Sequence, residues 1–392
     1  MATNTRRAHL MRRVIHALTP GDHFSPRTGS AIPTVVHGIA SASADDPDYA
    51  HSVLVESSTY RPRYTSAASI EYAGRGYPAS WERAVDLGLS RLGLPRVRSR
   101  RSYGPLVDAI DAREPGIVIA HNAPVLPEMI AATPHAVIYY AHNDLPRGMS
   151  RHEATRMLGA AVAVVVVSDD LADRIAARVS PSVSQQIRVV ENGVDTDAFQ
   201  PPVRTESGDR TRVMFVGRVV AEKGPDVLLR AVAALGRDDV DVVIVGSQGF
   251  DPKAALSPYE QELRALADAV PGTVSFRPFV DRAALPGQLQ SADVFVAPSR
   301  WAEPSGLTIG EAMATGLPVI ASDIGGIPSV IGDAGLLVEP GDAPALAAGL
   351  GALLDDDSRR AALGARARER AQARSWAHTW TQLRGVLDES AD

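Results

Sequence analysis

The feature that most constrains this chain is a repeated alternation between short runs rich in valine and isoleucine and longer stretches of helical period. Runs that are apolar throughout are typical of strands buried on both faces of a parallel sheet, with helices as connections. The strands expected on this basis are Arg13–Leu18, Ser52–Val55, Ile117–His121, Val137–Ala141, Val162–Val167, Ile187–Val190, Arg212–Val216, Val242–Val245, Val274–Phe276, Val294–Ala297, Val319–Ala321 and Gly335–Val338. The pattern predicts an α/β fold with doubly wound parallel sheets.

The length of the chain, 392 residues, predicts more than one hydrophobic core. Near the middle, Gln200-Pro201-Pro202 and the polar stretch Thr205–Arg210 interrupt the alternation and form the best candidate for a linker. We therefore predict two Rossmann-like domains, residues 1–200 and 201–374, facing each other across a cleft. Ligands of such sheets bind beyond the carboxyl ends of the strands, so function is expected in the strand-to-helix loops.

Composition excludes several classes of site. The chain has no cysteine, which rules out disulfides, thiolate metal sites and cysteine nucleophiles. A net charge of −6 gives no broad basic surface, so we expect no nucleic-acid partner. The longest apolar run, Ala160–Val167, is far shorter than the roughly 20 residues that span a bilayer, and the arginine-rich N-terminus lacks the apolar block of a signal peptide. We expect a cytoplasmic protein, with peripheral contact at the inner membrane face left open.

Two strand-to-helix loops of the second half carry the chemistry. Arg218 and Lys223 lie in one of them, and two cations there suit a ligand with adjacent phosphates, although a surface pair near a helix start is the plainer explanation. The other loop opens a helix whose first backbone N–H groups are available to an anion. Glu303 precedes that helix and Glu311 lies one turn inside it. A carboxylate near the start of a helix often does no more than interact favourably with the helix dipole.

Together these residues resemble a known family. The segment Glu303–Ile320 resembles the donor-binding signature of the family 4 retaining glycosyltransferases, which have the GT-B fold. Other matching stretches are Phe215–Arg218, Glu222–Gly224, Glu191–Asp195 with Phe199, Gly325–Pro328 and Gly335–Val338. The likeness is strong from about Ala161 onwards and weak from Ser43 to Pro115, where this family varies its acceptor site.

The resemblance implies residue roles. Arg218 and Lys223 match positions that neutralise the donor diphosphate as it leaves, Glu303 the carboxylate that bonds the transferred sugar, and Glu311 the one that bonds the ribose. His142 matches a cleft histidine near the reacting centre, although a lone histidine at a strand end is often structural. Further donor-binding residues implied are Gly29, Ser30, Gly217, Pro278, Val280, Ser305, Gly306, Leu307 and Thr308.

The resemblance also implies the mechanism and the path of the C-terminus. It implies a nucleotide-sugar donor, transfer with retention by front-face attack, and no cofactor or bound metal. The Asp-x-Asp motifs Asp195-Thr196-Asp197 and Asp239-Val240-Asp241 imitate a metal site, but the first sits in a turn where aspartate caps backbone and the second precedes a strand. Residues 375–392, with tryptophans and a leucine at helical spacing, are expected to pack back on the first domain.

The acceptor is where the sequence is least like the family. Tyrosines, a tryptophan and arginines alternate between Tyr60 and Tyr103, and such side chains stack on sugars and bind anions. We therefore hypothesise a carbohydrate, anionic or lipid-linked acceptor held by this segment, the alternative being a solvated loop. Two other functions stay open: a sugar-nucleotide epimerase or hydrolase, and a non-catalytic sugar-nucleotide-binding module. The sequence does not indicate the nucleobase, the sugar or the number of subunits.

Overall fold

The computed structural model describes residues 11–75, 85–86, 88–89, 97–202, 210–251 and 253–390, which fold into two sheets. The first has the order β3-β2-β1-β4-β5-β6-β7 and the second the order β10-β9-β8-β11-β12-β13. Their strands are β1 Arg12–Ala17, β2 Tyr49–Glu56, β3 Ala68–Tyr72, β4 Ile117–His121, β5 Ala136–Ala141, β6 Ala163–Val166, β7 Ile187–Val189, β8 Thr211–Val216, β9 Val240–Val245, β10 Thr273–Arg277, β11 Val294–Ala297, β12 Val319–Ser322 and β13 Leu336–Val338. The strand pairings within both sheets are parallel, which confirms the predicted fold class.

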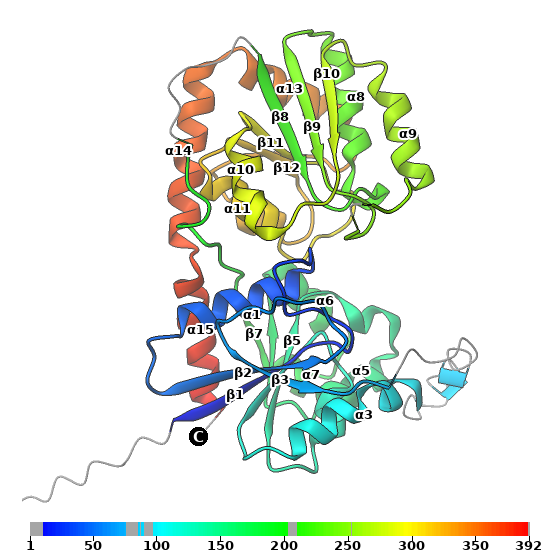
Figure 1. Ribbon diagram of the computed structural model, residues 1–392, viewed down its shortest axis with the longest axis vertical. Coiled ribbons are helices and arrows are strands. Elements are labelled where there is room, and N and C mark those ends of the chain that lie inside the picture. Colours follow the sequence, from blue (N-terminus) through cyan, green and yellow to red (C-terminus); the bar gives the residue numbers. More distant parts are fainter. Residues whose placement is uncertain are drawn as a thin grey trace, which may run out of the picture.

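Helices cover both faces of each sheet (Figure 1). They are α1 Ala31–Ala42, α3 Val97–Asp111, α4 Leu126–Ile130, α5 Arg151–Leu158, α6 Asp169–Ala176, α7 Pro181–Ser184, α8 Pro225–Leu235, α9 Pro258–Ala267, α10 Leu285–Gln290, α11 Leu307–Ala314, α12 Ile327–Ile331, α13 Ala343–Leu354, α14 Asp357–Ala373 and α15 Trp376–Glu389, with 3₁₀ turns at Leu145–Gly148, Ala221–Lys223 and Arg282–Ala284. In the first sheet α1 and α15 pack on one face, and α3 and α4 on the other. In the second, α8, α9 and α13 oppose α10, α11 and α14.

The two-residue period of each strand divides its side chains between two cores. In β8, Val213 and Phe215 pack towards α8 and α13, whereas Met214 between them packs towards α10 and α11. All three are buried, which explains why the strand reads as a continuous apolar run rather than an alternating one. The carboxyl ends of both sheets, and therefore their strand-to-helix loops, face the gap between the two halves.

The C-terminal helix returns to the first half of the chain. Figure 1 shows α14 beside the second sheet and α15 continuing down beside the first. Helix α15 packs against α1, where Trp376 lies so close to Gly38 that a side chain at that position would clash. The outgoing and returning segments are joined by a parallel bridge between Val194 and Ser375. The polypeptide therefore crosses between the two halves twice, and the two crossings lie side by side at this bridge.

Strand β3 and helix α1 are among the elements that the sequence did not lead us to expect. Strand β3 is mostly exposed at the sheet edge, so Ala68–Tyr72 lacks the apolar run that marks a buried strand. Helix α1 begins with Ala31-Ile32-Pro33 and follows the loop after β1. The change from the first core to the second falls between Val190 and Val194, somewhat before Gln200, and Phe199 already packs in the second core. Most of the polar stretch Thr205–Arg210 lies outside the described residues.

Candidate active site

A cleft lies between the carboxyl ends of the two sheets. It brings together most of the residues singled out in the sequence, which come from both halves of the chain. Those that line it are Gly29, Ser30, His142, Gly217, Arg218, Lys223, Glu303, Ser305, Gly306, Leu307 and Thr308. The residues that do not line it are Pro278, Val280 and Glu311, whose positions are given below. This cleft is therefore the candidate active site.

The loop after β8 supplies the two cations. Arg218 is exposed and, within the described part of the chain, makes no ion pair, so its guanidinium is available to a ligand. Lys223 ends the 3₁₀ turn before α8 and forms an ion pair with Glu303. Ser299 donates a hydrogen bond of 3.2 Å to the same carboxylate oxygen, Oε1. Because Glu303 is buried, the Lys223 ammonium balances its charge while both still face the cleft.

The N-terminus of α11 forms the floor between these groups. Gly306 precedes the helix with φ of 75°, in the left-handed region that favours glycine, and a Cβ there would lie 3.0 Å from Ile309 Cδ1. The helix then begins at Leu307, so the N–H groups of Leu307 and Thr308, which line the cleft, have no acceptor within the helix, whereas that of Ile309 donates to the Gly306 carbonyl at 3.0 Å. Such N–H groups and the helix dipole are suited to an anion, and Arg218 lines the same cleft.

Glu311 lies one turn inside α11 and is paired with a residue that the sequence did not indicate. Arg282 Nη2 lies 2.6 Å from Glu311 Oε1, while Oε2 is buried without a hydrogen-bond partner among the described residues. The Arg282 guanidinium lines the cleft and lies 5.6 Å from the ring centroid of Phe199. Burial pulls the pKa of Arg282 down, but the Glu311 carboxylate more than compensates and leaves that pKa raised. Arg282 follows β10 without any motif of its own, so no local signal marks it.

The two remaining predicted residues lie beside the cleft. Val280 and Gly29 line an adjoining hollow with Phe250 and Phe279, and Pro278 lines a further pocket bordered by Phe276 and Arg277. A Cβ on Gly29 would lie 2.6 Å from Phe250 Cε1, so the first-domain loop touches the second domain here. The same contact includes a hydrogen bond of 3.2 Å from the Arg282 backbone N–H to the carbonyl of Pro26.

His142 follows β5 in the opposite wall of the cleft and is fully buried apart from its cleft face. Its backbone is held by Asn122, whose Oδ1 accepts hydrogen bonds from the N–H groups of His142 and Asn143 at 2.8 and 3.2 Å. Asn122 has φ of 49°, an uncommon conformation outside glycine. Burial lowers the pKa of His142 to about 3, so the ring is neutral at pH 7.

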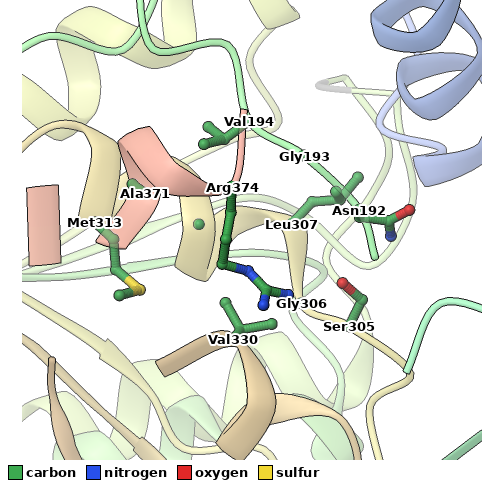
Figure 2. A pocket seen from close by; sticks show the side chains of 11 residues that line it. Asn192, Gly193, Val194, Ser305, Gly306, Leu307, Met313, Val330, Ala371 and Arg374 are labelled. Carbon is green, nitrogen blue, oxygen red and sulfur yellow. The ribbon is translucent and has the colours of Figure 1, made fainter. Parts of the chain in front are cut away.

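A small hollow lies behind the start of α11, between that helix and the double connection of the two halves (Figure 2). Its lining residues are Asn192, Gly193, Val194, Ser305, Gly306, Leu307, Gly310, Met313, Val330, Ala371 and Arg374. Arg374 comes from the end of α14 and pairs with Glu191 at 2.6 Å. The segments that join the domains therefore pack directly on the loop that opens α11.

The aromatic and arginine-rich segment does not reach the cleft. Within the described residues, none from 60 to 103 lines it, and Tyr77, Trp81 and Arg96 lie outside those residues. Arg61 and Arg63 both pair with Glu71, at 2.5 and 3.0 Å. Tyr72 and Tyr103 point into a core cluster. The structure thus gives no support to the hypothesis that this segment holds the acceptor.

The Asp-x-Asp motifs have local partners. Asp195 Oδ1 accepts the backbone N–H groups of Asp197 and Ala198 at 3.1 and 2.9 Å. Asp239 pairs with Arg237 at 2.6 Å, and Asp241 with Arg210 at 2.8 Å. Across the described ranges, no three histidine, aspartate or glutamate side chains are grouped as metal ligands. No described helix is long and apolar enough to cross a membrane.

Comparison with known proteins agrees with this geometry. Residues 71–198 match the sequence profile "Glycosyltransferase Family 4" and residues 197–370 match "Glycosyl transferases group 1". A D-inositol 3-phosphate glycosyltransferase of Xylanimonas cellulosilytica is 36% identical over 253 residues, which cover 60% of this chain and 59% of that protein. Spore coat protein SA of Bacillus subtilis is 31% identical over 288 residues, 68% of this chain and 76% of that protein.

Solved structures share the fold. Anabaena HepE in complex with UDP and glucose superimposes with a TM-score of 0.71 at 18% identity, covering 96% of this chain and 99% of that one. Sucrose-phosphate synthase from Thermosynechococcus elongatus gives a TM-score of 0.74 at 22% identity, covering 96% and 98%. The two profiles account for most of the chain, and they meet where the first core gives way to the second. The chain belongs to the family 4 glycosyltransferases and has their GT-B fold.

Proposed function

We propose that this protein transfers a sugar from a nucleoside-diphosphate donor to a hydroxyl group of an acceptor. The observation that carries the proposal is the convergence of Arg218, Lys223 and the N-terminus of α11 on one cleft between two parallel sheets. Two cations and free backbone N–H groups suit a diphosphate, and Glu303 beside them suits sugar hydroxyls. Arg282, held by its ion pair with Glu311, would complete the wall on the nucleoside side.

The proposed transfer retains the anomeric configuration and needs no metal ion. The bond between the anomeric carbon and the leaving phosphate oxygen breaks while the acceptor oxygen forms a new bond on the same face. The acceptor proton passes to the departing phosphate oxygen. Arg218, Lys223 and the α11 N–H groups stabilise the negative charge that develops there. Removing one such preorganised group typically costs about 3–4 kcal/mol, or roughly 10²–10³ in rate.

The relatives suggest which substrates to test first. HepE was solved with UDP and glucose, which supports a UDP-sugar donor. Several relatives are named D-inositol 3-phosphate glycosyltransferase, which supports a phosphorylated polyol as one anionic acceptor. The matched region spans only about half to three fifths of those relatives, so their acceptor does not transfer to this chain without a test.

The experiment is a thermal-shift screen of UDP-, GDP- and ADP-sugars followed by transfer assays with each donor that binds. A ligand at 100 times its dissociation constant adds about 2.7 kcal/mol of stability, which such a screen detects. Transfer of the sugar to inositol phosphates or other glycan acceptors supports the proposal. Donor turnover that is independent of acceptor would instead indicate an epimerase or hydrolase, and donor binding without turnover a binding module.

A further inference from the structure

Two loops of the second half of the chain bring Lys223 and Glu303 together in the cleft. Lys223 ends the 3₁₀ turn Ala221–Lys223 after β8, and Glu303 lies in the loop between β11 and α11. The two side chains form an ion pair although they lie 80 positions apart in the chain. Their relative position therefore depends on the contacts that join the two loops.

Arg300, in the loop of Glu303, makes most of these contacts. Its guanidinium meets the Asp226 carboxylate side by side, with Nη2 2.6 Å from Oδ2 and Nη1 3.0 Å from Oδ1. Asp226 lies in the first turn of α8, and Nη1 also lies 3.4 Å from the carbonyl oxygen of Ala221. The backbone N–H of Arg300 donates to the Glu222 carbonyl at 2.8 Å. Arg300 thus holds the segment around Lys223 on both sides, before it in the turn and after it in the helix.

Asp226 is a firm anchor for this arginine. Its side chain is 8% exposed, and it also accepts a hydrogen bond of 2.6 Å from the Tyr259 hydroxyl on α9. A planar guanidinium that bonds both oxygens of a carboxylate fixes direction as well as distance. The backbones approach closely beside the pair, because Gly224 has φ of 68° and a Cβ there would collide with the carbonyl oxygen of Pro298. The two loops are therefore in contact through side chains and through backbone.

Arg300 and Asp226 do not belong to the wall of the cleft. The neighbours of Arg300 in the chain, Ser299 and Trp301, line the cleft, whereas neither Arg300 nor Asp226 is among the described residues that do. Any effect of this pair on a reaction in the cleft therefore passes through the loops that the pair joins.

We propose that Arg300 and Asp226 are positioning residues, which link the loop of Lys223 to the loop of Glu303 and so set the position of this cation against this carboxylate. The Lys223–Glu303 pair is then in place before a ligand arrives. Groups that are fixed in advance stabilise developing charge without reorganising, and a displacement of about 1 Å can lower a rate about a hundredfold. The consequence for transfer rests on the proposed function, whereas the link between the loops does not.

Hydrogen exchange of backbone amides tests the link in the full chain. Arg300→Met keeps an unbranched side chain but loses both bonds to Asp226 and the contact with Ala221. We expect peptides from both loops to exchange about tenfold faster in this variant. Tyr259→Phe is a matched control, because the tyrosine bonds the same carboxylate but belongs to neither loop, and exchange in the loops should stay within about twofold of wild type. Unchanged exchange in Arg300→Met, or equally fast exchange in Tyr259→Phe, overturns the proposal.

A double variant separates positioning from stability. In Arg300→Met the Asp226 carboxylate stays buried without its bidentate partner, so this variant should also unfold at a lower urea concentration. Arg300→Met/Asp226→Asn leaves no such charge and should recover most of the loss, and it carries the test alone if Arg300→Met does not fold. The loops still lack their link, so they should exchange as fast as in Arg300→Met. Exchange at the wild-type rate in the double variant overturns the proposal, because the loosening would then come from the unpaired charge.

Transfer kinetics test the consequence for the reaction. We expect kcat to fall about ten- to a hundredfold in Arg300→Met and equally in the double variant. The donor dissociation constant should stay within about threefold, because Arg218 and the N-terminus of α11 still face the diphosphate. Tyr259→Phe should keep the wild-type kcat. Loosened loops with unchanged kcat, or a kcat that recovers with stability in the double variant, overturn the positioning role. Absence of transfer in the wild type with every donor and acceptor rejects the proposed function, while the exchange result still stands.

Discussion

The pair Arg282–Glu311 makes the sharpest prediction about stability, because only one of its two charges is deeply buried. The Glu311 side chain is 4% exposed and the Arg282 side chain 22%. Replacing Arg282 by methionine removes the counterion and keeps an unbranched chain of similar reach in the gap. Glu311 Oε2 has no partner among the described residues, so this substitution leaves the carboxylate without any strong hydrogen bond from a charged group.

The expected magnitudes follow from these exposures. Removing one partner of an ion pair costs about 3–5 kcal/mol of folding stability when the charge that remains is buried and unpaired. We expect Arg282→Met to lie in this range. Glu311→Gln should cost less, about 1–2 kcal/mol, because Arg282 remains partly hydrated and the amide oxygen can still accept. The double variant should cost little more than Glu311→Gln alone, since no uncompensated charge is left. The coupling in the cycle is then about 3–5 kcal/mol, close to the cost of Arg282→Met alone.

The assay is urea denaturation at pH 7, followed by circular dichroism, for the wild type and all three variants. A loss below about 1 kcal/mol in Arg282→Met would refute the reasoning, since it would show that Glu311 is solvated or otherwise paired. A double variant as unstable as Arg282→Met would refute it equally, because the damage would then come from lost packing. Arg230→Met is a matched control: Arg230 lies 3.8 Å from the buried carboxylate of Asp226, but that carboxylate keeps its bonds from Arg300 and Tyr259, so this substitution should cost little.

Three further predictions concern activity and assembly. Arg218→Ala and Lys223→Ala should each slow transfer at least about a hundredfold with the fold intact, measured as kcat with circular dichroism as the control, and near-normal turnover in both would show that the site is elsewhere. Transfer should persist in EDTA because these cations face the diphosphate, whereas loss of activity restored by Mn²⁺ or Mg²⁺ would contradict this. Deleting the residues after Arg374 should loosen the first domain because α15 packs on α1, and hydrogen exchange unchanged throughout residues 11–200 would count against it.

The parts of the site that the sequence predicted are those with local signals. Gly306 is needed for a left-handed backbone immediately before a helix, and Arg218 and Lys223 lie in one loop after an apolar strand. Each of these features is contained within a few consecutive residues. The fold class was predictable for the same reason, since buried parallel strands are continuous apolar runs. Strand β3 could not be predicted in this way, because an exposed edge strand has no continuous apolar run.

The rest of the site depends on contacts between residues far apart in the chain. Arg282 lies 29 positions before Glu311, in a loop without a motif, so nothing in its neighbourhood indicates a charged partner. The acceptor hypothesis stays a prediction, and it meets a related limit: two arginines of that stretch, Arg61 and Arg63, are paired with the carboxylate of Glu71, which the composition alone does not reveal. Sequence composition reports which charges are present, but the fold decides which of them are already paired.

Four histidines on neighbouring strands, His51, His16, His121 and His142, have ring nitrogens within hydrogen-bond distance of one another and show the same limit at the level of topology. His16 and His121 are separated by 105 positions, and they meet because β1 pairs with β4. The two-residue period places His51, His16, His121 and His142 on the face of the sheet that carries α1 and α15. At the end of this row the His51 ring contacts Trp380, on the helix that returns from the second half. The helix that ties the two domains together therefore also borders a row of histidines that ends at a residue of the cleft, a neighbourhood that no stretch of the sequence reveals.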